Sequence, residues 1–296
     1  RETPEHLSAT LTRAPGFALG HAAKGLFTLL LGRSELTAPA RASLAAADAA
    51  LAGAGGTRRE RAHVEALRAW LEGRPTRSVE ILGGVLEETP EDALAMKLDH
   101  AIRFVLGDRH GMERTMRRVM PAYAEDHPAA GYARGCLAFA LEETGQYAEA
   151  ERAGRAAIER AGDDAWGLHA VAHVYDMTAR NAAGIAWLEG QTARWAHCNN
   201  FAAHVWWHLA LFHLDEGRHE RVLALYDERI RAERTDDYRD IANAASMLTR
   251  LEIEGVPVGD RWEELADLAE GRVEEGCVVF ADLHYLLSLG GAGRAE

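Results

Sequence analysis

The sequence predicts an all-α protein in which helical hairpins follow one another to form an α-solenoid. A glycine followed by a short polar turn recurs at intervals of 34 to 38 residues, and Arg180-Asn181 fills one gap in this series. Between these marks apolar residues recur at helical spacing, as in Leu137, Leu141 and Tyr147, and no segment alternates convincingly with a period of two. A repeat of this length is typical of stacked helical hairpins. The glycines of the series are Gly73, Gly107, Gly145, Gly217 and Gly255.

Each interval is long enough for two helices of about 14 residues and one tight turn. Glycine suits the turn because it readily adopts the left-handed conformation that ends many helices. This spacing is that of tetratricopeptide repeats, although no unit carries their full consensus. A single hairpin cannot bury its apolar face, so we expect the hairpins to stack into one right-handed superhelix, a single domain over residues 1–296.

Signals for helix starts follow one another along the chain. Thr3-Pro4-Glu5 begins a leading helix, and Pro90-Glu91-Asp92, Pro128 and Asp163-Asp164 begin later ones, because caps, proline and carboxylates favour the first turn. Gly53-Ala54-Gly55-Gly56 is interpreted as a flexible link after an alanine-rich helix. The expected hairpins cover residues 16–54, 57–88, 91–124, 129–160, 164–196, 201–232 and 237–272, with a capping helix at 276–289.

The composition narrows the possible partners and the compartment. With 48% hydrophobic and 27% charged residues, the chain can bury a core. A formal net charge of −13 argues against nucleic acid as the main ligand, since that affinity rests on basic residues. The longest strongly apolar stretch, Gly25 to Leu31, is too short to span a membrane. Three scattered cysteines fit a reducing cytoplasm, and the excess of arginine over lysine suggests a bacterial genome.

Histidine and tryptophan are concentrated in one part of the sequence. Seven of the 14 histidines and five of the seven tryptophans lie between residues 164 and 220. His169 and His173 are four residues apart, as are His204 and His208, so each pair lies on one face of a predicted first helix. First helices are expected to line the inner surface, where adjacent hairpins could bring the two pairs together. The four side chains are therefore candidate metal ligands or catalytic acid–base groups.

Other residues are candidates for the same site. His100 and His173 each stand seven residues before a turn mark, so both are expected at the same level of the inner wall. Asp176 could supply an oxygen ligand or a hydrogen-bond acceptor one turn after His173. The remaining candidate ligand-binding residues are Trp166, Trp206, Trp207, His63 and His284. The alternative interpretation is that the histidines are hydrogen-bonded core residues, because the specific His-Glu-x-x-His motif is absent.

Several segments resemble the tetratricopeptide repeat protein 38 family in their order and spacing. They are DAWGLHAVAHVYDM, GIAWLEG, HVWWHLALFHLDEGR, LALYDERI, SMLTRLEIEGVPVGDRW and FADLHYLLSL, with fainter matches in TRRERAHVEAL and DALAMKLDHA. The resemblance implies a helical-repeat fold found in bacteria and animals, with no established biochemical role. The family pattern includes the four paired histidines and extends to His63, His100 and His284, but it usually has glutamate where this chain has Asp176.

Two principal functions follow from these patterns. The first is a pocket rich in His and Trp that binds a small molecule or a divalent transition metal, and that could be a metal-dependent or acid–base enzyme. The alternative is an interaction scaffold whose concave groove holds a peptide or a helix of a partner protein. A third interpretation gives the histidines a purely structural role. The sequence does not specify a substrate, the metal or the oligomeric state.

Overall fold

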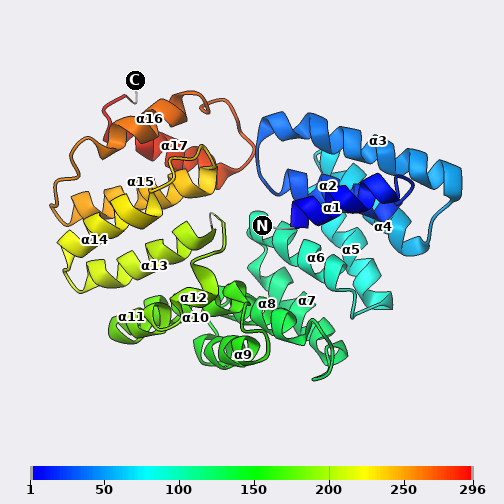
Figure 1. The fold of residues 1–296 in the computed structure, drawn as a ribbon, viewed down its shortest axis with the longest axis horizontal. Helices are drawn as coiled ribbons and strands as arrows, with labels where there is room; N and C mark the ends of the chain where they lie inside the picture. The colour runs from blue at the N-terminus through cyan, green and yellow to red at the C-terminus, as the bar shows by residue number, and fades with distance from the viewer. Residues whose placement is uncertain (1–2, 200, 295–296) are drawn as a thin grey trace. The chain divides into compact units, whose positions relative to one another are not determined.

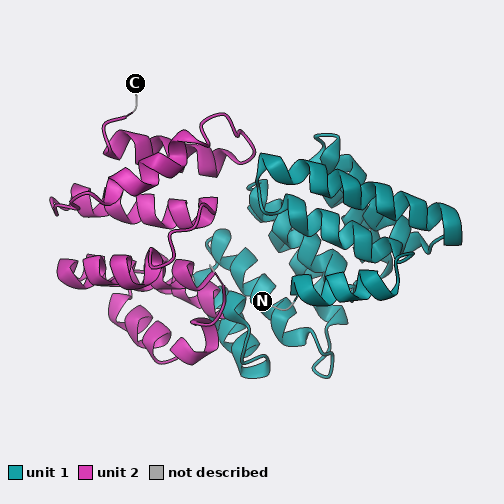
Figure 2. Cartoon of the chain, turned by 45° about the horizontal axis from the view of Figure 1, so that its top comes forward, with its two compact units in different colours: residues 1–167 teal, residues 168–296 magenta. Residues whose placement is uncertain are grey.

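The computed structural model describes residues 3–199 and 201–294. Within these residues the regular elements are all helices, seventeen of them α-helices (Figure 1), and the predicted all-α fold of tandem helical hairpins is confirmed. No helix in this part of the chain is both long and apolar enough to cross a bilayer. The chain divides into two compact units, residues 1–167 and 168–296 (Figure 2), and the boundary falls inside helix α10. The single domain over residues 1–296 stays a prediction.

The first unit contains a leading helix and four helical hairpins. In each hairpin the second helix follows the first after a short connection and packs against it. The bounds are α1 Thr3–Arg13, α2 Ala18–Leu29, α3 Thr37–Ala54, α4 Arg58–Leu71, α5 Pro75–Glu88, α6 Ala93–Val105, α7 Arg109–Val119, α8 Ala130–Glu143 and α9 Tyr147–Arg160. Short 3₁₀ helices, Ser34–Leu36 and Met120–Ala122, precede α3 and follow α7.

The second unit continues the hairpin pattern from α10 onward. Its helices are α10 Ala165–Met177, α11 Asn181–Glu189, α12 Thr192–Trp195, α13 Phe201–Asp215, α14 His219–Leu225, α15 Tyr238–Ile253, α16 Arg261–Glu270 and α17 Val279–Gly291. A π-helical turn, Tyr226–Ile230, extends α14. Helix α13 packs against α11, α14 and α15. The π-helical turn also packs against α13 and α15.

The same turn conformation recurs between the two helices of most hairpins. Gly73, at φ 76°, ends α4, and the N–H of the next residue, Arg74, donates to the carbonyl of Ala69. Gly107, Gly145, Gly217 and Gly255 have the same left-handed conformation. In the hairpin of α10 and α11, whose turn has no glycine, the left-handed residue is Ala179, at φ 53°. The Arg180 N–H there donates to the Tyr175 carbonyl. The turn therefore begins one residue earlier than the Arg180-Asn181 mark.

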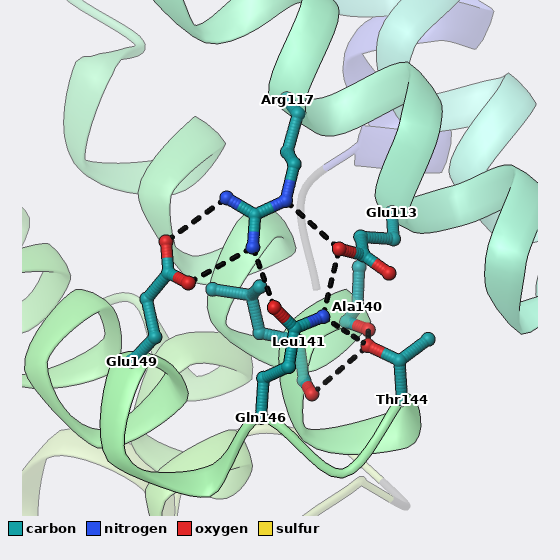
Figure 3. Close-up of polar contacts among 7 residues, drawn as sticks. All are labelled: Glu113, Arg117, Ala140, Leu141, Thr144, Gln146 and Glu149. Atoms are coloured by element: carbon teal, nitrogen blue, oxygen red, sulfur yellow. Dashed lines mark hydrogen bonds and ion pairs between the residues drawn. The ribbon is translucent and has the colours of Figure 1, made fainter.

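A polar network joins consecutive hairpins on the surface of the first unit. The guanidinium of Arg117 on α7 contacts Glu113 on the same helix, the side-chain oxygen of Gln146 at 2.7 Å and Glu149 on α9 at 2.9 Å (Figure 3). The Gln146 amide also donates to Glu113 and to the Thr144 hydroxyl. Arg117 thereby links the second helices of two neighbouring hairpins.

Candidate metal centre

Four histidines from two helices meet in the second unit. Helix α10 carries His169 and His173, and helix α13 carries His204 and His208, each pair one turn apart. His169 and His208 are each 2% exposed, whereas His173 and His204 are half-buried. The apolar neighbours of these residues on both helices, including Leu168, Val205 and Leu209, lie in the core. The two pairs face each other, since the ring of His169 on α10 contacts those of His204 and His208 on α13.

The four Nε2 atoms converge on one point. His169 Nε2 lies 2.8 Å from His173 Nε2, 2.9 Å from His204 Nε2 and 3.1 Å from His208 Nε2. His204 Nε2 and His208 Nε2 are 3.2 Å apart. Three of the nitrogens therefore form a nearly equilateral triangle, with the fourth beside one corner. All four can offer a ligand atom to the same metal ion.

Hydrogen bonding among the rings cannot account for this convergence. A neutral imidazole nitrogen carries either one hydrogen or one lone pair, so it takes part in one good hydrogen bond. His169 Nε2 nevertheless has three other ring nitrogens within 3.1 Å. If the Nε2 atoms carry lone pairs, those lone pairs repel one another unless a cation lies between them. A metal ion between the four nitrogens would remove this repulsion.

Burial keeps the imidazoles neutral, the form that binds metals. It lowers the pKa of His169 and His208 well below the usual value, and the neighbouring histidines lower both further. Burial also lowers the pKa of His204 to about 4, although the hydrogen bond with Asn243 opposes this shift. At neutral pH these rings therefore offer lone pairs without first losing a proton.

Four of the six separations among the nitrogens can be compared with those of a tetrahedral site. With metal–nitrogen bonds of about 2.0 Å, the nitrogens of a tetrahedral site lie about 3.3 Å apart. The four observed separations run from 2.8 Å to 3.2 Å. These four separations are a few tenths of an ångström shorter than those of a tetrahedral site, and all four ligand atoms lie within 4.8 Å of one another. Residues of this type suit zinc, copper, nickel or iron, because imidazole is a preferred donor for those ions.

Three side chains around the cluster were not identified from the sequence. The side-chain oxygen of Asn243 on α15 lies 2.9 Å from His204 Nδ1. The ring of Phe201 lies 5.2 Å from that of His169, centroid to centroid. The Arg250 guanidinium lies 5.6 Å from the ring centre of Trp207. The sequence spacing could have pointed to Asn243. It follows His204 by 39 residues, about one repeat, just as His204 follows His169 by 35.

The predicted aromatic residues have different surroundings. Trp207 stacks on His204 with ring centres 5.5 Å apart and an interplanar angle of 11°, and its edge contacts His208. Trp206 instead packs against Trp195 and the guanidinium of Arg229. Trp166 belongs to the first unit, where it lies 4.5 Å from Phe139. Trp207 therefore contacts two of the four histidines, His204 and His208.

The remaining predicted site residues are distributed over both units. His100 and His63 belong to the first unit, where His100 is 1% exposed and His63 Nδ1 bonds the Arg59 carbonyl at 2.8 Å. Asp176 is half-buried on α10, one turn after His173. His284 on α17 bonds the Phe280 carbonyl through Nδ1 at 2.7 Å. Their participation in the site stays a prediction.

Comparison with known proteins adds one structural likeness. No family model matches the chain. Among solved structures, the tetratricopeptide-repeat domain of P58(IPK) is 13% identical and aligns with a TM-score of 0.29, over 98% of this chain and 82% of that one. A TM-score this low supports no argument about this chain. Membership of the tetratricopeptide repeat protein 38 family stays a prediction.

Proposed function

We propose that this protein binds one divalent transition metal ion through His169, His173, His204 and His208. The observation that carries the proposal is the convergence of four Nε2 atoms with neighbouring separations of 2.8–3.2 Å. Assembling two buried and two half-buried polar rings around one point costs free energy unless a partner satisfies them. A cation is the partner whose charge matches four lone pairs.

The donor set favours transition metals over calcium or magnesium. Calcium and magnesium prefer oxygen ligands, whereas neutral imidazole is a common ligand of zinc, copper, nickel and iron. Because four histidines would fill a tetrahedral ion, Lewis-acid chemistry on a small molecule would require a fifth ligand position at the half-buried side of the cluster. The half-buried rings, His173 and His204, would lie nearest to an approaching small molecule.

The acid–base version of the function has less support from the same site. A general acid or base works best when its pKa lies near the operating pH. The pKa of His204 is about 4, and burial lowers the pKa of His169 and His208 far below the usual value. Neutral imidazoles of this kind are better metal ligands than proton donors at neutral pH. The alternative prediction is an interaction scaffold that binds a peptide or a helix of a partner protein. We also propose that the chain belongs to the tetratricopeptide repeat protein 38 family.

Metal analysis of the purified protein tests this proposal. The protein is stripped with a chelator, reconstituted separately with zinc, cobalt, nickel and copper, freed of loose ions and analysed for metal per chain. We expect one ion per chain, and visible absorption of the cobalt form that is typical of four-coordinate nitrogen ligation. In His169→Ala/His208→Ala, binding should fall to background.

Two further variants make the result decisive. His110, exposed on α7 in the first unit, provides the matched control, and His110→Ala should retain one ion per chain. His173→Gln alters a half-buried ligand and keeps the two buried ones, so it should fold and yet bind at least tenfold more weakly. Far-ultraviolet circular dichroism verifies folding of each variant. Equal metal content in the wild type and the folded double variant would refute the proposal.

A further inference from the structure

The amide of Asn243 occupies a position that calls for an explanation. It is 6% exposed on α15, and the residues beside it, Ile241, Ala242, Ala244 and Ala245, lie in the core. A buried amide in such surroundings is costly unless it is hydrogen-bonded. Its side-chain oxygen lies 2.9 Å from His204 Nδ1, on the side of the ring opposite the converging nitrogens.

We infer that Asn243 is a positioning residue that holds His204 in the tautomer with hydrogen on Nδ1, leaving the Nε2 lone pair for a metal. This inference rests on the proposed metal site. An amide oxygen accepts but cannot donate, so the hydrogen of the contact must come from Nδ1. Neutral imidazole has one N–H, and Nε2 then carries a lone pair directed at the cluster.

The surroundings of His204 restrict the orientation of its ring as well as its tautomer. Trp207 stacks on one face at an interplanar angle of 11°, and the Arg250 guanidinium lies over the Trp207 ring. Ring rotation would break both the stack and the Asn243 contact. Metal-binding histidines commonly donate their second N–H to such an acceptor, which orients the ring and increases its basicity.

The contact also extends the site to a third hairpin. The four histidines come from α10 and α13, whereas Asn243 comes from α15, the first helix of the next hairpin. One residue from each of three successive first helices, His169, His204 and Asn243, therefore forms a chain of contacts. Packing of α13 against α15 holds the last link.

The tautomer can be measured before any metal is added. In metal-free protein labelled with ¹⁵N-histidine, long-range ¹H–¹⁵N spectra distinguish a protonated Nδ1 from a protonated Nε2, and His204→Gln identifies the His204 signals. We expect His204 to carry its hydrogen on Nδ1 in the wild type. In Asn243→Leu, which cannot accept, the Nε2–H form should appear. A wild-type His204 protonated on Nε2 would overturn the inference.

Metal affinity provides the second measurement. Zinc titration should show Asn243→Leu binding roughly 10- to 100-fold more weakly than the wild type. Asn243→Asp can still accept from Nδ1, so it should retain wild-type affinity or bind more tightly. Thr249→Ala is the matched control on α15, because the Thr249 hydroxyl bonds only the Ala245 carbonyl of its own helix among its described contacts.

The outcomes separate this inference from the proposed function. If the wild type binds no metal, the proposed function fails, and the tautomer spectra still decide the role of Asn243. If the wild type binds metal and Asn243→Leu binds equally well, the positioning role is wrong although the metal site stands. If Asn243→Leu does not fold, loss of binding in folded Asn243→Asp would overturn the inference, since an acceptor is still present.

Discussion

His100 shows how one buried imidazole makes stability depend on pH. It lies on α6 in the first unit, 1% exposed, with its ring 5.8 Å from that of Phe139 and 6.1 Å from that of Trp166. Within the described residues neither ring nitrogen has a hydrogen-bond partner. Burial, and secondarily the charge of Lys97, lowers the pKa of His100 well below 6.5. The folded protein therefore keeps this ring neutral.

Lowering the pH should destabilise the protein partly through His100. Below the usual histidine pKa of about 6.5, the unfolded chain binds a proton that the folded chain does not. The free energy of unfolding then falls by up to about 1.4 kcal/mol per pH unit for this residue. Above about pH 7 the contribution is constant. Urea titrations of wild type and His100→Phe between about pH 7 and pH 5 measure this effect. The variant should lose less stability over that range, and parallel curves would contradict the assignment.

At the scale of the helix, the end of α10 carries a conformation that its residue type disfavours. Ala179 adopts φ 53°, whereas glycine fills the corresponding position in five other turns. A left-handed conformation costs a residue with a side chain about 1–2 kcal/mol. The packing of α11 against α13, which requires this turn, offsets the cost of the left-handed conformation.

Replacing that alanine by glycine should stabilise the protein. Ala179→Gly removes the strain, and although glycine increases the entropy of the unfolded chain, we expect a net gain of about 0.5–1 kcal/mol in unfolding free energy. Ala186→Gly, at an exposed position in the middle of α11, is the control and should cost about 1 kcal/mol, because glycine is unfavourable within a helix. Chemical denaturation measures both variants. A loss of stability in Ala179→Gly would contradict strain at this turn.

The packing of α11 on α13 depends on a helical glycine. A Cβ atom built on Gly184 would lie 2.4 Å from the ring of Phe212, which is fully buried on α13. Neither the ring nor the backbone can move away freely in a close-packed interior. Phe212 is one turn after His208, so this contact also holds the helix that carries two of the candidate ligands.

Adding a methyl group at Gly184 should therefore destabilise the folded protein. Gly184→Ala is expected to lower the unfolding free energy by about 1–3 kcal/mol, the usual cost of overpacking. Gly83 on α5 has open space around the corresponding position, so Gly83→Ala should stabilise by about 0.5–1 kcal/mol. Thermal unfolding of both variants gives the comparison. Equal effects of the two substitutions would show that the Phe212 contact does not limit the packing.

Across the whole molecule, the candidate metal ligands belong to one compact unit. His169, His173, His204 and His208, together with Asn243, all lie in residues 168–296. An ion that binds only the folded state stabilises it by about 2.7 kcal/mol when its concentration is 100 times the dissociation constant. Since α10, α13 and α15 carry the site, a bound ion should stabilise these helices against local opening more than it stabilises the rest of the chain.

Hydrogen exchange tests where the stabilisation acts. Adding zinc to chelator-treated protein should slow amide exchange in α10, α13 and α15, by up to about 100-fold where exchange requires opening of the site. Helices α2 to α5 of the first unit should change little. The His169→Ala/His208→Ala variant, which lacks two of the proposed ligands, serves as the control and should show no zinc effect. Protection spread evenly over both units would argue against an ion held at the four histidines.

The repeat structure could be predicted from the sequence because its determinants are local. Glycine turns at near-constant intervals and apolar residues at helical spacing are properties of short segments, as are the i,i+4 pairs His169/His173 and His204/His208. The approach of His169 Nε2 to His204 and His208 and the contact of Asn243 with His204 depend on which side chains pack between helices 35 to 39 residues apart. The packing of Trp206 on Trp195, away from the histidines, is likewise a tertiary contact. Only the tertiary structure decides these contacts, because the angle and depth at which two helices pack are set by the volumes of residues distant in the chain.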